Sequence, residues 1–169
     1  MIFDLKTPFS EDVIRQLKVG DVVNISGYIY TGRDAVLPKI IRLAEENRLD
    51  DYGINLQGAV IFHTAVSPAG VGPTSSNKVE IESSFEPLSR YGVKMHLGKG
   101  AISKETVQVL AEQNAVFAII PPVTALLGSQ TVEQKIIAFP ELGMEAFNQL
   151  RVVNYQAIIA AAKGVSIYD

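Results

Sequence analysis

Hydrophobic and polar residues alternate along this chain in two different periods. In residues 37–44, apolar side chains recur at positions i, i+3, i+4 and i+7, which is the spacing of a helix with one buried face. Residues 21–30 are instead rich in β-branched and aromatic side chains, which is typical of a strand. Gly27 interrupts this strand, and a glycine there predicts a bulge or a close approach by another backbone segment.

Capping residues mark the beginnings of other helices. Ser10 and Ser103 stand directly before helical patterns, where a hydroxyl can accept a hydrogen bond from a free backbone N–H group. Residues 79–91 predict a further helix. Pro38 fits only the first turn of its helix, so we expect residues 31–34 to form the loop that leads into it.

Short apolar runs predict the remaining strands. These runs cover residues 57–65, 93–97, 116–120, 135–139, 151–153 and 165–168. Residues 67–77 are rich in Gly, Pro and Ser and predict a long loop. The order of elements is typical of the α/β fold class with a mixed sheet. We expect a single domain over residues 1–169, with residues 1–19 as an N-terminal arm and helix.

Composition and charge exclude several classes of protein. With 47% hydrophobic and 20% charged residues, the chain is expected to bury one core. A net charge of −3 argues against a nucleic-acid-binding surface, which needs clustered Lys and Arg. The N-terminal stretch contains Asp4 and Lys6 among its apolar residues, so it predicts neither a secretory signal nor a membrane span. We therefore expect a soluble, cytoplasmic protein.

The absence of cysteine excludes a disulfide scaffold and a self-contained iron–sulfur cluster held by thiolates. The two histidines, His63 and His96, are too few for a zinc or non-haem iron site, so we expect no metal ligands in this chain. Both are interpreted as core or surface residues rather than catalytic groups.

Three glycine-containing loops carry the candidate chemistry, and each follows a predicted strand. Ligands of open α/β sheets bind beyond the carboxyl ends of strands, so this placement is suggestive. In the first loop, Thr31-Gly32-Arg33-Asp34, the planar fork of Arg33 matches the geometry of a carboxylate. From this tetrapeptide alone, an Arg33–Asp34 contact or a helix-capping contact at a surface turn is the favoured interpretation.

The other two loops offer hydroxyls and a lysine. Residues 70–78 combine Ser and Thr with backbone N–H groups near the start of a helix, which is a natural cradle for an anion, although these hydroxyls could equally cap the helix. This loop lacks the Gly-Lys-Ser/Thr ending of a Walker A motif, and no GxGxxG follows the first strand, so a nucleotide-binding domain is weakly supported. Lys99, between Gly98 and Gly100, could approach a bound anion or simply be a solvated loop residue.

The order of four motifs adds a resemblance. SG-x-IYTGRDA, GPTSS-x-K, GKG and AFPELGMEA follow one another at compatible spacing. From Gly20 to Tyr168 the chain resembles the small subunit of class I fumarases and L-tartrate dehydratases, which in many bacterial enzymes is the C-terminal part of one fused chain. This resemblance implies a swivelling β/β/α domain with a mixed sheet, docked on a larger α subunit whose cysteines hold a [4Fe–4S] cluster.

The resemblance also implies roles for individual residues. Thr74 matches the threonine proposed as the catalytic base of this family. The positions expected to bind the dicarboxylate substrate are Arg33, Lys78, Lys99, Ser75 and Gly98. The implied activity is the reversible hydration of fumarate to L-malate, or of a close dicarboxylate such as tartrate, by a heterotetramer in which this chain alone is inactive.

Several residues depart from the family pattern. Lys78 replaces an arginine and so offers a point charge in place of a bidentate fork. Leu37-Pro38 stands where His-Lys or His-Arg is common, Ser75 replaces a second threonine, and residues 120–124 replace a run of Gly and Ala. These differences leave a second hypothesis open, in which the chain is a non-catalytic module that binds small anions or assists assembly.

Overall fold

The structure is a computed structural model that describes residues 2–67, 70–74, 78–120 and 130–168, and gives only the backbone for the described residues between 67 and 81. An eight-stranded sheet has the order β1-β2-β3-β6-β7-β9-β10, with β8 paired to β9. Four neighbouring strands run parallel. They are β2 (Val22–Thr31), β3 (Val60–Phe62), β6 (Met95–Gly98) and β7 (Val116–Ile119). The expected α/β class with a mixed sheet is confirmed.

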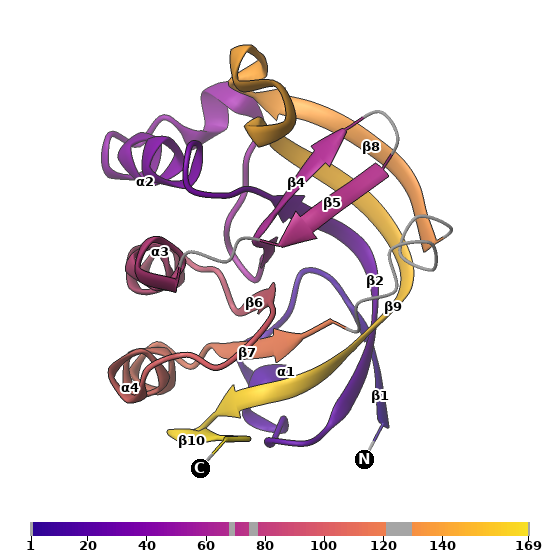
Figure 1. Cartoon of the computed structure of the whole chain (residues 1–169), viewed down its shortest axis with the longest axis vertical. Coiled ribbons are helices and arrows are strands. Elements are labelled where there is room, and N and C mark those ends of the chain that lie inside the picture. Colours follow the sequence, from indigo (N-terminus) through magenta and orange to yellow (C-terminus); the bar gives the residue numbers. More distant parts are fainter. Residues whose placement is uncertain (1, 68–69, 75–77, 121–129, 169) are drawn as a thin grey trace.

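Strand β9 (Phe147–Ala162) closes these four strands into a five-strand barrel, because it pairs antiparallel with both β2 and β7. Figure 1 shows that β9 extends from near the top of the molecule to its lower end. The barrel is filled by alternate residues of its strands, including Ile25, Phe62, Leu97 and Tyr155, all at most 1% exposed. Among the described residues, these side chains pack the interior of the barrel, as is usual for a barrel of this size.

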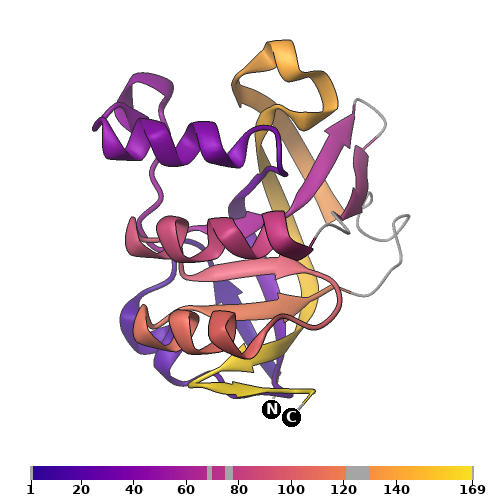
Figure 2. The same ribbon diagram turned by 60° about the vertical axis from the view of Figure 1, so that its left-hand side comes forward.

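Three helices cover one side of the barrel, as Figure 2 shows. These are α2 (Leu37–Glu45), α3 (Lys78–Arg90) and α4 (Lys104–Glu112). Helices α2 and α4 follow the parallel strands β2 and β6, and Figure 2 shows that α3 begins on the same side as both. Helix α1 (Glu11–Arg15) is the remaining α-helix among the described residues. In this part of the chain, no helix is both long enough and apolar enough to cross a membrane.

Local signals in the sequence were reliable guides to these elements. The Ser10 and Ser103 hydroxyls accept hydrogen bonds from the N–H groups of Val13 and Thr106, both at 3.2 Å, and so cap α1 and α4. The pairing of β2 with β9 shifts register at Gly27, which confirms the predicted bulge, and a side chain there would collide with Thr7. Strand β1 (Ile2–Lys6) adds to the sheet edge by parallel pairing with β2.

One expectation for these segments was wrong, and one expected strand is longer than predicted. Residues 70–74, predicted as loop, form β5 (Gly70–Thr74), which pairs with β4 (Thr64–Ser67) as a separate two-stranded sheet. Cross-strand hydrogen bonds stabilise this hairpin although glycine and proline disfavour strands. The region around residues 151–153 is the middle of the 16-residue strand β9. Its neighbours β2, β7 and β8 (Thr131–Ala138) supply its hydrogen bonds.

The remaining elements are short. Two 3₁₀ segments, η1 (Leu49–Tyr52) and η2 (Pro140–Glu145), lie beyond α2 and β8 in the chain. Strand β10 (Val165–Ser166) ends the sheet by pairing with the last residues of β9. Segment η2 lies at the top of Figure 1, next to the ends of β8 and β4.

Candidate functional site

The carboxyl ends of the parallel strands form one continuous edge. Hydrogen bonds between neighbouring segments continue one residue beyond the strands: Gly32 N–H donates to Phe62 O at 3.1 Å, and His63 N–H donates to Leu97 O at 3.0 Å. The Ile120 N–H donates to Gly98 O at 3.3 Å. The residues that directly follow β2, β3 and β7 are therefore each bonded to the neighbouring strand at this edge.

The expected site residues reach this edge from separate parts of the chain. Arg33 lies two residues beyond β2, and Lys99 follows β6 directly. Thr74 is the last residue of β5 and pairs with Thr64, which stands two residues beyond β3. Lys78 is the first residue of α3. The structure thus brings the backbones of these four residues to one edge of the barrel.

Some predicted features lie outside the described residues. These are Ser75, most of the unusual segment at residues 120–124, and the side chains of Thr74 and Lys78. Gly98 is described, and it is buried at the end of β6. A side chain at Gly98 would lie 3.2 Å from the ring of Phe117, so a glycine suits this packing.

The backbone at Arg33 is fixed by the start of α2. The carbonyl oxygen of Arg33 accepts hydrogen bonds from the N–H groups of Val36 at 3.2 Å and Leu37 at 3.0 Å. The preceding Gly32 has no room for a side chain, because a Cβ atom there would lie 2.9 Å from side-chain atoms of both Val36 and Leu37. The arginine is therefore presented by a rigid turn and not by a free loop.

The Arg33 side chain forms an ion pair with Glu145, at the end of η2. Its Nε atom lies 3.4 Å from Oε2 of Glu145, which is within ion-pair distance, although Nε is buried and makes no hydrogen bond in this geometry. The partner of Arg33 in this ion pair comes from η2 and lies outside the tetrapeptide. Glu145 belongs to the AFPELGMEA motif but was not singled out as a site residue.

Lys99 projects from a loop that is tied down at both ends. Gly98 is held by the hydrogen bond from Ile120 described above, and Ser103 N–H donates to Oε1 of Glu82 in α3 at 2.7 Å. Gly100 has φ 76°, a left-handed conformation that favours glycine. The Lys99 side chain itself is exposed, so its charge can reach a ligand above the rim.

Helix orientation adds positive potential at the same edge. The first N–H groups of a helix lack intrahelical partners and carry partial positive charge. Because α2, α3 and α4 all begin at this edge, their N-termini act in the same sense as Arg33 and Lys99. The arrangement favours a small anion with more than one negative group.

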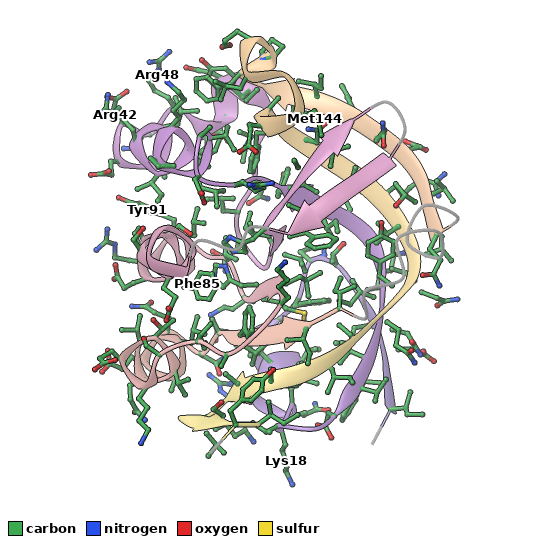
Figure 3. All side chains as sticks on the ribbon, viewed as in Figure 1. Lys18, Arg42, Arg48, Phe85, Tyr91 and Met144 are labelled. Carbon is green, nitrogen blue, oxygen red and sulfur yellow. The ribbon has the colours of Figure 1, made fainter. Side chains whose placement is uncertain are left out.

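A buried chain of polar groups lies between the sheet and α3. Nε2 of His63 is 3.0 Å from Nδ1 of His96, and Nε2 of His96 is 2.9 Å from the Ser89 hydroxyl. The Phe85 ring stacks on His96 with 4.4 Å between ring centres, and Figure 3 labels Phe85 where α3 faces the sheet. Both histidines are at most 1% exposed, which confirms them as core residues.

Burial keeps both imidazoles neutral. Removal from water disfavours the charged form, and it lowers the pKa of His63 to about 3. The pKa of His96 is also held well below its usual value, first by burial and then by the neighbouring His63. Nδ1 of His63 is buried without a hydrogen-bond partner among the described residues. Sequence reasoning missed this pairing, because the two histidines are 33 residues apart and meet only across β3 and β6.

Comparison with known proteins identifies the family. The sequence profile described as "Fumarase C-terminus" matches residues 2–169, almost the whole chain. The chain belongs to the Fumarase C-terminus family. This confirms the resemblance drawn from the four motifs.

Members of the Fumarase C-terminus family with assigned names give a consistent picture. The chain is 30% identical to the L(+)-tartrate dehydratase subunit beta of Escherichia coli K12, over 93% of this chain and 81% of that protein. It is also 30% identical to a Methanocaldococcus jannaschii protein provisionally named L(+)-tartrate dehydratase subunit beta, over 92% of this chain and 86% of that protein. A Geobacillus stearothermophilus protein provisionally named fumarate hydratase class I is 29% identical over 99% of this chain, which spans only 34% of that protein.

Proposed function

We propose that this chain is the β subunit of a two-subunit hydro-lyase that interconverts fumarate and L-malate, or acts on a close dicarboxylate such as tartrate. Its family and the names of its relatives support the reaction class. One observation carries the proposal: cationic residues and a threonine from four separate segments have their backbones at one edge of the barrel. Such an edge suits a dianion.

The chemistry explains why several cations would be needed. In the dehydration direction, a proton leaves the carbon beside one carboxylate, hydroxide leaves the neighbouring carbon, and negative charge builds up in the transition state. Arg33, Lys78 and Lys99 would hold the carboxylates and stabilise this charge where it grows. Thr74 would act as the base in its alkoxide form, whose oxygen accepts the proton and becomes a hydroxyl. A hydroxyl is a weak base, so this role requires the positive field of the neighbouring cations.

Ser75 and Gly98 would complete the substrate contacts of this subunit. They adjoin Thr74 and Lys99 in the chain, so they belong to the same two loops. Backbone N–H groups and a serine hydroxyl are suitable donors to a carboxylate. Specificity for one dicarboxylate over another would then depend on these donors together with Lys78, whose point charge tolerates more carboxylate orientations than an arginine fork.

The partner would supply what this chain lacks. A [4Fe–4S] cluster is held by cysteine thiolates, and the sequence has no cysteine, so the cluster would reside in an α subunit. When bound there, the cluster supplies Lewis-acid chemistry at the departing hydroxyl. The complete enzyme would be a cytoplasmic heterotetramer, and the β subunit would be inactive alone because it holds only part of the site.

Alanine variants of the two described cations test this assignment. In the complex with the cysteine-bearing subunit, Arg33→Ala and Lys99→Ala should each lower kcat/KM for fumarate or its close relative by at least tenfold, equivalent to about 1.4 kcal/mol of lost transition-state stabilisation. Lys18→Ala is the matched control. Lys18 is an exposed lysine that Figure 3 shows at the end of the molecule away from α2. Near-normal kcat/KM in both site variants would contradict the assignment.

A further inference from the structure

Glu145 places a negative charge beside the arginine that is proposed to bind a substrate carboxylate. The side chains of Arg33 and Glu145 are only 26% and 31% exposed, so the ion pair is largely shielded from water. An acidic group in this position repels a dianion, and the repulsion is stronger where water is excluded. A carboxylate that opposes ligand binding in this way needs a compensating role.

The point of contact on the guanidinium indicates that role. The guanidinium group is planar and donates from three nitrogens, so it can serve two carboxylates along different edges. Glu145 approaches Nε, which is buried, at 3.4 Å. A carboxylate at Nε faces one side of the planar group, and the donor edge formed by Nη1 and Nη2 is a separate one that can serve a second carboxylate.

The backbone of η2 holds Glu145 in place. The segment begins after Phe139, which has φ 56°, and it turns at Gly143, which has φ 61°. Ala146 N–H then donates to the carbonyl of Gly143 at 3.0 Å. The side-chain amide of Asn148, in β9, donates to the carbonyl of Ala146 at 3.1 Å. The carboxylate of Glu145 is thus presented by a fixed turn that continues into the barrel.

We propose that Glu145 is a positioning residue, which fixes the plane of the Arg33 guanidinium so that its Nη1 and Nη2 end receives one carboxylate of the substrate. This inference rests on the proposed function and deepens it. An arginine side chain has several rotatable bonds, and holding it in one orientation before binding reduces the entropy lost when substrate binds.

Steady-state kinetics of the complex with the cysteine-bearing subunit test the proposal. With fumarate as substrate, Glu145→Ala should raise KM about tenfold and change kcat by less than about threefold, because substrate binding is affected first. Glu145→Gln retains an oxygen near Nε and should raise KM only about threefold. Glu141→Ala, at an exposed glutamate of the same segment, is the control and should leave KM unchanged. Thermal unfolding of each variant verifies that it is folded.

A double-mutant cycle decides whether Glu145 acts through Arg33. In the Arg33→Ala background, Glu145→Ala should no longer lower kcat/KM, since there is no guanidinium to orient and only the repulsion between Glu145 and the dianion is removed. An equal effect in both backgrounds would overturn the proposal. So would a lower KM in Glu145→Ala, which would make Glu145 a competing counterion. A severe Arg33→Ala defect with a neutral Glu145→Ala would overturn this inference alone. A neutral Arg33→Ala would remove the proposed site and this inference with it.

Discussion

At the scale of single residues, burial decides what the ionisable groups can do. His63 and His96 are shielded by Phe85 and hydrogen-bonded to one another, so they remain neutral and serve packing. Arg33 is only partly shielded, and its charge is balanced by Glu145 on one side. The rim of the barrel thus has the neutral histidine pair beneath it and the charged Arg33 and Glu145 nearer its surface.

The buried histidines predict acid-sensitive stability. The pKa of His63 is lowered to about 3 in the folded chain, whereas an unfolded histidine titrates near 6.5. Between these values the unfolded state binds more protons, so the free energy of unfolding should fall as pH decreases from about 6.5, by up to about 1.4 kcal/mol per pH unit for this histidine. Urea unfolding at pH 7.0, 6.0 and 5.0 measures this.

The pH range of this loss of stability distinguishes the histidine pair from the other ionisable groups. Both histidines of the sequence are in this pair. The carboxyl groups of Glu11 and Asp21 have lowered pKa values, so the stability that they contribute to the fold is lost only at lower pH. His63→Asn combined with His96→Gln should be less stable at pH 7 but should lose the slope between pH 6.5 and 5. A wild-type protein with constant stability over this range would show that the imidazoles are accessible to protons.

At the scale of elements, the turn between β2 and α2 connects the fold to the site. Gly32→Ala would place a Cβ atom 2.9 Å from both Val36 and Leu37 and force the turn to shift. We expect a loss of about 1–3 kcal/mol in the free energy of unfolding, which is typical of overpacking. We also expect a decrease in kcat/KM, because Arg33 would move with the turn. Ala35→Ser, at an exposed position of the same turn, should change stability by less than about 0.5 kcal/mol.

Elements with local signals were predictable from sequence, and those that depend on distant partners were not. The helices carry their caps and their periodic apolar faces within the segment itself, as Ser103 and Pro38 illustrate. Strand β5 contains two glycines and a proline and exists because it pairs with β4. Strand β9 contains Asn154 at positive φ and several alanines, and its length follows from its pairing with four other strands.

In the candidate site, too, residues in local motifs were predictable and contacts between distant residues were not. Arg33, Lys99 and Thr74 could be named as candidates from the order of the motifs. Glu145 could not be named, since its contact with Arg33 joins residues 112 positions apart (145 minus 33) and depends on the path of η2 over the barrel. The histidine pair likewise required the register of β3 beside β6.

At the scale of the whole molecule, closure of the barrel by β9 determines where chemistry is possible. A packed barrel has no interior cavity for a dicarboxylate, so the substrate would bind on the rim where the parallel strands end. A rim site is open on its outer side. Enclosing the substrate therefore requires a second protein surface, which agrees with the proposed division of labour between two subunits.

Fumarate hydration by this chain, by its cysteine-bearing partner and by an anaerobic mixture of the two tests the central claim most directly. The account predicts no measurable L-malate from either protein alone and rapid turnover from the mixture, with loss of activity when Arg33→Ala replaces the wild-type chain. If the mixture fails to hydrate fumarate or any close dicarboxylate while the isolated chain binds them tightly, the claim that this chain holds part of a shared site is contradicted.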